Sequence, residues 1–430
     1  MTHQVIVIGA GIAGSAVARR LQAGGARVAL IGGIAHAGIE GLSERSVRLL
    51  GENGVQLKSL PAARTGAWGA RRIEGREWLV GREVLAQSMR REATAAGVST
   101  YQGWVRSTER VGDLWTVGLN SGFTLAAPWL IDARGRRGHE VCGPKLLAVA
   151  FAGRSRATSA PQTHIEPLDT GWCWWARGGG ELFVQITRRP RAAPPQGWLR
   201  DAADELPELQ AALMAAEGMA KVGARPAHAR CAIGSAHDSL WRVGDSAWAP
   251  DPLSGQGVYE ALRSAQLVST ALGSVFSGGA LEAARRFVAE RQAYAFERAV
   301  RIAADFYREN CERGPFWREI ADEYANLLRN EPVEVQPHVE PRPVLADGRI
   351  VLRDVLVTRD YPRGVWLVGG VPIAPLFGEM TWQSETDDGT RAINQPAAAV
   401  ERARRWLKQQ MGPENVPGPA LHQEFIRADH

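Results

Sequence analysis

Three glycines close to the start of the chain, Gly9, Gly11 and Gly14, form a Gly-x-Gly-x-x-Gly motif directly after the apolar run at residues 4–8. In such a motif the first glycine permits a tight turn, and the second lets the backbone approach a pyrophosphate. The third lets the following helix pack closely against the strand. The positive N-terminus of that helix then faces the phosphates. The motif predicts a dinucleotide phosphate site, and by itself it allows NAD, FAD or an ordinary glycine-rich turn.

The residue that would bind an adenosine ribose is absent from its usual place. Residues 26–31 have the composition of a second buried strand, and a carboxylate normally follows such a strand. Here Ile31 leads into Gly32 and Gly33. This departure weakens an NAD assignment.

A second glycine-rich segment lies more than two hundred residues downstream. Gly244-Asp245 is followed by Asp251-Pro252-Leu-Ser-Gly255-Gln256-Gly257, and a long helix is predicted after Gly257. The N-terminus of that helix would stabilise negative charge on a bound cofactor. The segment resembles the FAD-dependent monooxygenase and halogenase superfamily, which shares the architecture of the aromatic hydroxylases. The resemblance implies that Asp245 contacts the flavin ribityl chain. It also implies that four residues of the loop approach the isoalloxazine ring: Pro252, Gly255, Gln256 and Gly257.

Further positions match the same superfamily. Glu40 lies in a segment similar to the Gly-Glu-Ser motif that follows the second strand, and Arg45 is a second candidate contact. Arg82 directly precedes a predicted helix at 83–96, as in the superfamily's Asp-Arg pair, although Gly81 replaces the acid. Asp132 ends a predicted strand at 128–131, where the resemblance places it beside the pyrophosphate. The resemblance thus implies that FAD contacts Glu40, Arg45, Arg82 and Asp132.

These positions require an α/β fold with a Rossmann-like FAD-binding domain. We expect that domain to be discontinuous, formed by residues 1–144 and 229–330, with a helical extension at 257–330. Residues 145–228 contain short apolar and aromatic segments typical of an inserted antiparallel sheet on the substrate side. Residues 331–430 are expected to form a small C-terminal α+β module with a helix at 397–410 and a disordered tail.

A halogenase of this superfamily uses a lysine and carries a Trp-x-Trp-x-Ile-Pro signature. The chain keeps Trp172 and Trp174 but lacks the Ile and Pro, and Arg64 is the only basic residue in the region where the lysine would fall. Arginine stays charged and cannot serve as a neutral amine. Both tryptophans fall on one face of a strand and can simply pack against the sheet. Halogenase is therefore the alternative to a hydroxylase.

A hydroxylase of this type needs few catalytic side chains, because the flavin C4a-hydroperoxide is itself the electrophile. The sequence accordingly shows no clear catalytic constellation, and the weak candidates are Arg64, His237 and Trp174. No second dinucleotide motif is present, so the electrons are expected from transiently bound NAD(P)H or from a separate reductase. The four widely spaced cysteines predict no metal site.

The overall resemblance is to flavoproteins that mature tryptophylquinone cofactors. It implies hydroxylation of the indole ring of a tryptophan in a protein or peptide substrate during biogenesis of a CTQ-type cofactor, with maturation proteins as partners. The alternatives are a halogenase, a hydroxylase of a free small aromatic and a non-catalytic flavoprotein maturation factor.

Charge and composition exclude other classes. Lys and Arg number 51 against 46 Asp and Glu, a net charge of +5, with no long basic run or binding motif that would indicate nucleic-acid binding. No apolar run reaches the about 18 residues that a membrane span needs. The first strand begins close to Met1, so no signal peptide is expected. We expect a cytoplasmic protein.

Overall fold

The computed structural model describes residues 3–33, 38–136, 142–190, 197–232, 239–328, 336–381 and 395–411. Contacts between residues divide the chain into two units, Met1–Arg329 and Asn330–His430, each described here by itself. The candidate residue His237 lies outside the described residues.

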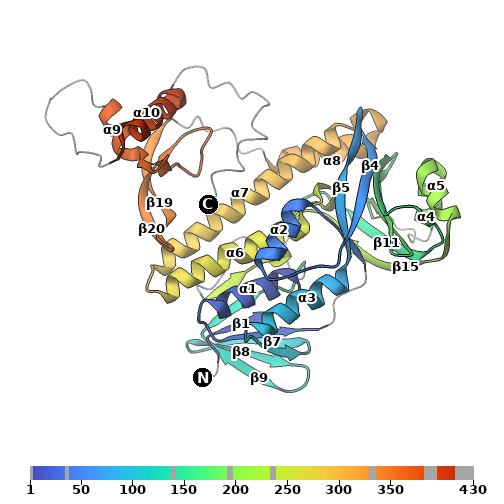
Figure 1. The fold of residues 1–430 in the computed structure, drawn as a ribbon, viewed down its shortest axis with the longest axis horizontal. Coiled ribbons are helices and arrows are strands. Elements are labelled where there is room, and N and C mark those ends of the chain that lie inside the picture. Colours follow the sequence, from blue (N-terminus) through green and yellow to red (C-terminus); the bar gives the residue numbers. More distant parts are fainter. Residues whose placement is uncertain are drawn as a thin grey trace. The chain divides into compact units, whose positions relative to one another are not determined.

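A five-stranded parallel sheet forms the centre of the first unit (Figure 1). In spatial order its strands are β17 (Leu240–Arg242), β10 (Trp129–Asp132), β1 (Val5–Ile8), β2 (Val28–Gly32) and β6 (Ser99–Gln102). Residues Val5–Ile8 are completely buried, as expected for a central strand rich in β-branched residues. Strand β1 pairs in parallel with both β2 and β10, so the Rossmann-like fold predicted from the sequence is confirmed.

Helices and a small sheet cover the two faces of this parallel sheet. On one side lie α1 (Ile12–Ala23), α3 (Arg82–Ala95) and α6 (Gly257–Phe276), with α1 in contact with both of the others. On the other side lies a sheet formed by β7 (Val105–Val111), β8 (Leu114–Leu119) and β9 (Thr124–Ala127). Ile6, Ile31 and Leu130 pack there against Val117 and Leu125. The sequence did not predict these three strands.

The first unit also contains a second sheet, which has eight strands. Its spatial order is β15 (Ala216–Pro226), β11 (Leu147–Ser155), β14 (Glu181–Arg188), β13 (Gly171–Gly178), β12 (Gln162–Leu168), β4 (Leu60–Trp68), β5 (Arg71–Gly81) and β3 (Ile39–Leu42). All neighbours are antiparallel except β12 and β4. The sequence predicts an antiparallel sheet at 145–228, and the structure adds β3, β4 and β5 to it.

The two faces of the eight-stranded sheet have different neighbours. Trp172 and Ile165 belong to a buried cluster with residues of α7 (Leu281–Arg308) and α8 (Pro315–Leu327). Cys173 and Trp175, which alternate with Trp172 along β13, pack against α4 (Trp198–Glu205) and α5 (Pro207–Met214). Leu253, from the second glycine-rich segment, belongs to the first cluster. The face that carries Trp172 is therefore turned toward the predicted cofactor loop, and we call it the inner face.

The second unit combines strands and helices around its own core. It contains β19 (His338–Ala346), β20 (Arg349–Val357), β21 (Leu367–Val368), β22 (Val371–Pro372), α9 (Ile373–Thr381) and α10 (Ala397–Met411). Leu356, Ile373, Leu376 and Leu407 are fully buried in it. A core of this kind allows the unit to be compact by itself.

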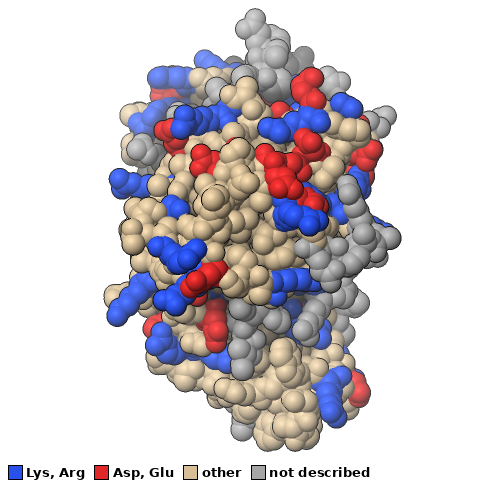
Figure 2. Space-filling view, turned by 90° about the vertical axis from the view of Figure 1, so that its right-hand side faces the viewer, with Lys and Arg blue, Asp and Glu red and all other residues tan. Residues whose placement is uncertain are grey.

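The surface shows no gathering of one sign of charge on the side seen in Figure 2, where basic and acidic side chains are interspersed. Within the described ranges, none of the helices has the length and apolarity needed to cross a membrane.

Candidate functional site

The glycine turn between β1 and α1 is shaped by two close backbone approaches. Gly9 has a φ of +108°, and a Cβ there would lie 2.3 Å from the carbonyl oxygen of Ala133. A Cβ on Gly14 would lie 1.8 Å from the carbonyl oxygen of Gly9. At Gly11 a Cβ would meet no atom within 4 Å, and no side chain caps the helix that follows. The turn therefore leaves the N–H groups of a helix N-terminus open beside Gly11, which fits a pyrophosphate.

Glu40 and Arg82 meet although they are distant in sequence. The Arg82 Nε donates to Glu40 Oε1 at 2.5 Å, and both side chains are about a quarter exposed. A Cβ on Gly38 would lie 3.8 Å from the ring of Phe183 and 3.9 Å from the Arg82 guanidinium carbon. The structure thus brings two predicted cofactor residues together, next to an aromatic ring of the inner face.

Asp132 ends β10 and is held by its own neighbour. Its buried carboxylate accepts hydrogen bonds from the backbone N–H and the guanidinium of Arg134, and this ion pair raises the pKa of Arg134. The backbone carbonyl of Asp132 accepts from the Val243 N–H. Asp132 therefore links β10 to the segment that contains Asp245.

Arg136 binds the segment that contains Asp245, a role that the sequence did not predict. Its Nε donates to Asp245 Oδ2 at 3.0 Å, and its Nη2 donates to the Pro250 carbonyl at 2.9 Å. It also donates to the carbonyl of His228 at 3.0 Å. The signal in the sequence that could have identified Arg136 is its place shortly after the predicted strand, two positions after Arg134. Arg136 clamps the chain on both sides of the Trp248–Ala249 strand (β18).

The loop from Asp251 to Gly257, called the 251–257 loop, leads into α6. It contains a short 3-10 turn, η3 (Pro252–Ser254), and Gly255 follows in the left-handed region with φ +62°. Gln256 precedes the helix without capping it by its side chain, and a Cβ on Gly257 would meet no atom within 4 Å. The N-terminus of α6 is thus another open helix end that fits a group carrying negative charge.

Arg45 lies at the same helix end. It belongs to α2 (Glu44–Glu52), and its guanidinium carbon lies 5.1 Å from the centre of the Tyr259 ring in the first turn of α6. Nearby, burial raises the pKa of Glu260, while Arg298, Arg263 and Arg45 oppose the rise. The predicted contact Arg45 is therefore close to the 251–257 loop.

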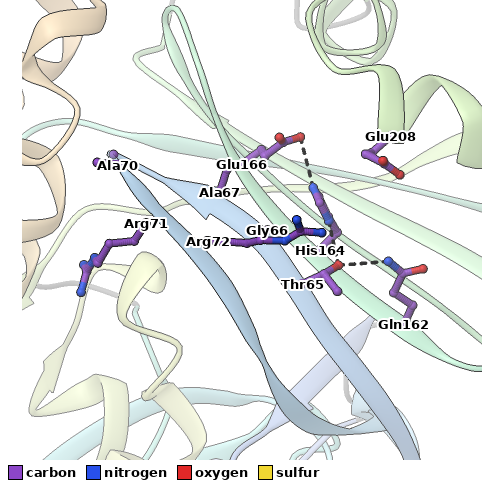
Figure 3. Close-up of a pocket in the computed structure, with 11 residues that line it drawn as sticks. Thr65, Gly66, Ala67, Ala70, Arg71, Arg72, Gln162, His164, Glu166 and Glu208 are labelled. Carbon is purple, nitrogen blue, oxygen red and sulfur yellow. Dashed lines mark hydrogen bonds and ion pairs between the residues drawn. The ribbon is translucent and has the colours of Figure 1, made fainter.

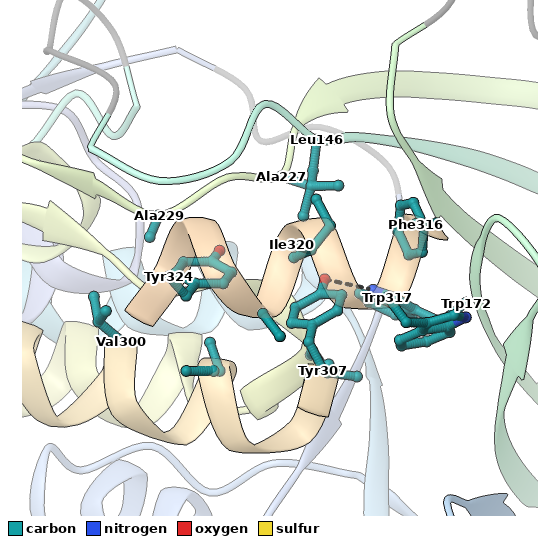
Figure 4. Close-up of a cluster of buried hydrophobic side chains, with 14 of the residues drawn as sticks. Leu146, Trp172, Ala227, Ala229, Val300, Tyr307, Phe316, Trp317, Ile320 and Tyr324 are labelled. Carbon is teal, nitrogen blue, oxygen red and sulfur yellow. Dashed lines mark hydrogen bonds between the residues drawn. The ribbon is translucent and has the colours of Figure 1, made fainter. Parts of the chain in front are cut away.

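A buried hydrogen-bond network holds the start of this loop, and Figure 4 shows three of its members, Trp172, Tyr307 and Tyr324. Asp251 is 1% exposed, and its Oδ1 accepts the Leu253 N–H at 2.9 Å. Its Oδ2 accepts the Tyr307 hydroxyl at 3.1 Å and the Tyr324 hydroxyl at 2.7 Å. Trp172 Nε1 donates to the Tyr307 hydroxyl at 3.1 Å. Burial raises the pKa of the Asp251 carboxyl, and these hydrogen bonds and Arg136 oppose the rise.

Arg64 and Trp174 lie on the inner face, as their register with Trp172 requires. Arg64 Nη1 lies 3.3 Å from Glu77 Oε1, so the arginine is engaged in an ion pair. Burial raises the pKa of Glu77, and Arg64 opposes the rise. Trp174 packs edge-on against Phe183 with ring centres 6.0 Å apart. A Cβ on Gly41 would lie 2.4 Å from Glu77 Oε2 and 3.3 Å from Trp174, so a larger residue there would displace the Glu77 carboxylate.

A cavity of about 510 Å³ opens on the opposite face of the sheet (Figure 3). Thr65 and His164 line it, with Thr65 Oγ1 2.9 Å from His164 Nδ1. His164 Nε2 lies 3.1 Å from Glu166, and Gln162 donates to Thr65 at 3.0 Å. Thr65 and His164 lie on the face of the sheet that is turned away from the 251–257 loop. We therefore do not assign the cavity to the cofactor site.

No group of three or more His, Cys, Asp or Glu side chains suited to a metal ion occurs in the part of the chain that the structure describes.

Comparison with known proteins gives the fold family. No protein-family model matches the chain, and no curated protein matches it by sequence. Among solved structures, the chain is similar to "peptidyl tryptophan dihydroxylase QhpG essential for tryptophylquinone cofactor biogenesis", with 28% identity and a TM-score of 0.80. That match covers 96% of this chain and all of the other.

Two further structures share the fold at lower identity. The flavin-dependent halogenase CmlS is 16% identical with a TM-score of 0.70, over 95% of this chain and 94% of the other. The 2,6-dihydroxypyridine-3-hydroxylase from Arthrobacter nicotinovorans is 13% identical with a TM-score of 0.59, over 74% and 94%. The resemblance to FAD-dependent monooxygenases and halogenases expected from the sequence is thus confirmed. The chain shares the fold of flavin-dependent halogenases and hydroxylases, and this similarity supports FAD as its cofactor.

Proposed function

We propose that this flavin-dependent oxidoreductase is a monooxygenase that hydroxylates the indole ring of a tryptophan side chain in a protein or peptide substrate. The observation that carries the proposal is the similarity to the peptidyl tryptophan dihydroxylase over nearly the whole length of both chains. The halogenase and the pyridine hydroxylase are less similar by identity and TM-score. We further propose that the product is an intermediate of tryptophylquinone (CTQ-type) cofactor biogenesis in the cytoplasm.

The proposed cofactor site consists of residues from both parts of the Rossmann-like domain, 1–144 and 229–330. The open helix ends at Gly11 and Gly257 support it, because both offer unpaired N–H groups. When bound, the reduced flavin supplies two electrons and activates O2. The contacts that we assign to FAD are Gly9, Gly11, Gly14, Glu40, Arg45, Arg82, Asp132, Asp245, Pro252, Gly255, Gln256 and Gly257.

The inner face of the sheet region 145–228 is the proposed substrate side. The half-buried ring of Trp174 and the ring of Phe183 offer aromatic surface there, next to Gly38 and Arg82. Aromatic side chains of this kind favour edge-to-face packing with another ring. The overall step is balanced when one atom of O2 enters a ring C–H bond, the other leaves as water, and the flavin provides both electrons. The chain needs only to hold the ring and exclude water.

Halogenation is the second candidate, because the structure resembles a flavin-dependent halogenase and keeps both tryptophans of the signature. The environment of Arg64 argues against it. The guanidinium is paired with Glu77 and stays charged, so it cannot form the haloamine that a neutral lysine would form. We therefore favour the hydroxylase.

The test is an intact-mass assay on the purified chain loaded with FAD. The bound flavin is reduced with NADPH, NADH or a separate flavin reductase. The protein is then given O2 and a panel of tryptophan-containing polypeptides, and a copy of each polypeptide with Trp→Phe serves as its control. We expect a mass gain of one or two oxygen atoms only in the tryptophan-containing copies. N-acetyl-tryptophanamide serves as the small aromatic probe.

Each other outcome of this assay supports a different function. A halogen mass in the presence of bromide identifies a halogenase, and oxidation of the small probe alone identifies a hydroxylase of free aromatics. Failure of the pure chain to bind FAD contradicts the proposal as a whole. Binding of FAD without any oxygenation across the panel leaves a flavoprotein maturation factor and contradicts the monooxygenase. A separate reductase in place of NAD(P)H is identified by which donor bleaches the flavin.

A further inference from the structure

Asp251 has the least exposed charged side chain among the described residues. It is 1% exposed, and its hydrogen-bond partners within the described part of the chain include no arginine or lysine. Burying a charge without compensation is expensive, so such a carboxylate is retained only when its surroundings satisfy it. Here three donors are directed at it, from Leu253, Tyr307 and Tyr324.

The donors come from three separate parts of the fold. Leu253 belongs to the 251–257 loop itself, Tyr307 lies near the end of α7, and Tyr324 lies in α8. The rings of Tyr307 and Tyr324 are stacked with centres 5.8 Å apart, and both are completely buried. Both hydroxyl groups are buried, so each hydroxyl proton depends on the carboxylate as its acceptor. The loop is thus fastened to two helices through one side chain.

The direction of the hydrogen bonds shows which charge state fits. The Tyr324 and Tyr307 hydroxyls both lie within reach of Oδ2, while the Leu253 N–H occupies Oδ1. Trp172 donates to the Tyr307 oxygen, which directs the Tyr307 proton toward Asp251. An acceptor that receives three donors in this way is an ionised carboxylate.

We propose that Asp251 is the positioning residue of the 251–257 loop, fixing it through Tyr307 and Tyr324 and keeping one negative charge beside the flavin. This inference rests on the proposed function, which places FAD at that loop. It adds a residue that does not itself contact the cofactor but sets the shape and the potential of the site. It also joins the loop to Trp172, two residues before Trp174 on the inner face.

A charge beside the flavin acts on its reduction, because the reduced flavin carries more negative charge than the oxidised one. Ionised Asp251 disfavours that charge. Asp251→Asn keeps the side-chain shape and removes the charge, so the flavin reduction potential should become more positive. Tyr324→Phe and Tyr307→Phe keep the rings and remove a donor that partly neutralises the carboxylate. These two variants should shift the potential in the opposite direction.

The experiment measures the flavin reduction potential by equilibration with a redox dye at pH 8.5, and the FAD dissociation constant by flavin fluorescence. The variants are Asp251→Asn, Tyr324→Phe and Tyr307→Phe, and Tyr101→Phe on β6 is the matched control. Each tyrosine variant should weaken FAD binding roughly tenfold, as expected for a lost hydrogen bond to a charged group. The control should leave both quantities unchanged.

Opposite shifts of the potential in the Asp251 and tyrosine variants support the inference. Shifts in one common direction, or no shift with FAD still bound, overturn it, because a purely structural role changes only the melting temperature. If Asp251→Asn does not fold, the two tyrosine variants decide by the sign of their shift. Failure of the wild-type chain to bind FAD would instead contradict the proposed function.

Discussion

Two alanine substitutions in the same turn should separate cofactor binding from folding. At Gly14 a Cβ would lie 1.8 Å from the Gly9 carbonyl oxygen, well inside the closest approach of real atoms. The helix or the turn would have to move, so Gly14→Ala should destabilise the apoprotein by about 3 kcal/mol, the upper range for overpacking. At Gly11 a Cβ would meet no atom within 4 Å, and the backbone at φ −79° suits alanine.

The two smaller effects at Gly11 oppose one another. Alanine is a poorer helix N-cap than glycine by a few tenths of a kcal/mol or more. It also restricts the unfolded chain, which stabilises by about 0.4–1 kcal/mol. Gly11→Ala should therefore change the stability of the apoprotein by less than about 1 kcal/mol. Its methyl group enters the space assigned to the pyrophosphate, where a clash of about 1–3 kcal/mol weakens FAD binding roughly 5- to 150-fold.

Urea denaturation of both apoproteins and fluorescence titration with FAD measure the two quantities separately. Gly25→Ala tests glycine replacement at a positive φ outside the turn, and it should reduce stability without changing the affinity of the folded protein for FAD. The reasoning is refuted if Gly11→Ala binds FAD as the wild type does. It is refuted equally if Gly14→Ala is as stable as the wild type.

Three other changes test the remaining parts of the site. Burial raises the folded-state pKa of Glu77 above its ordinary value of 4.5, so its contribution to stability is present below that value and is lost as the pH rises through the folded pKa. Glu77→Gln should gain stability relative to the wild type between pH 4.5 and pH 8, and urea denaturation that shows a constant difference would contradict the assignment. Arg64→Lys should yield no halogenated product with bromide, because Glu77 keeps the ammonium charged; a halogen mass in the product would show that a halogenase lysine had been restored. Arg136→Met should lower stability by about 1–3 kcal/mol and weaken FAD binding. Arg308→Met, which breaks an exposed ion pair, should change neither quantity. Equal effects of the two substitutions in thermal melts and FAD titrations would refute the role of Arg136.

The Rossmann-like elements could be predicted because their signals are local. The helix expected after the glycine turn is present as α1, and the strands expected at 4–8 and 128–131 agree with β1 and β10 within one residue. An apolar run, a glycine turn and a helical stretch in succession leave few alternatives. The long helices after Gly257 follow from the same kind of periodicity. The catalytic candidate His237 and the contacts made by FAD stay predictions.

The pairing of β4 with β12 could not be predicted, because it joins residues a hundred positions apart. Thr163 lies opposite Arg64, and Ile165 lies opposite Gly66. Strand β5 contains charged residues at most of its positions between Arg71 and Glu77, so no apolar alternation marks it as a strand. The ion pair of Arg64 with Glu77 depends on the pairing of β4 with β5, in which Glu77 lies opposite Ala62. Register of this kind is decided by tertiary packing rather than by the local sequence.

The same limit explains the two roles within the Trp172-x-Trp174 signature. Both residues were expected on one face of a strand, and both are there, but only Trp172 is fully buried with its indole N–H bonded. That hydrogen bond leads through Tyr307 to Asp251, so replacing Trp172 would leave the Tyr307 hydroxyl with one partner fewer in a dry core. Trp174, two residues further along the strand, is partly buried and packs against Phe183 and against the cluster of Ala62, Leu79 and Ala176. The first tryptophan thus supports the 251–257 loop through this hydrogen bond, whereas the second lies on the face that we propose for the substrate. The signature is therefore explained by the architecture of the loop support and is not by itself a mark of halogenation.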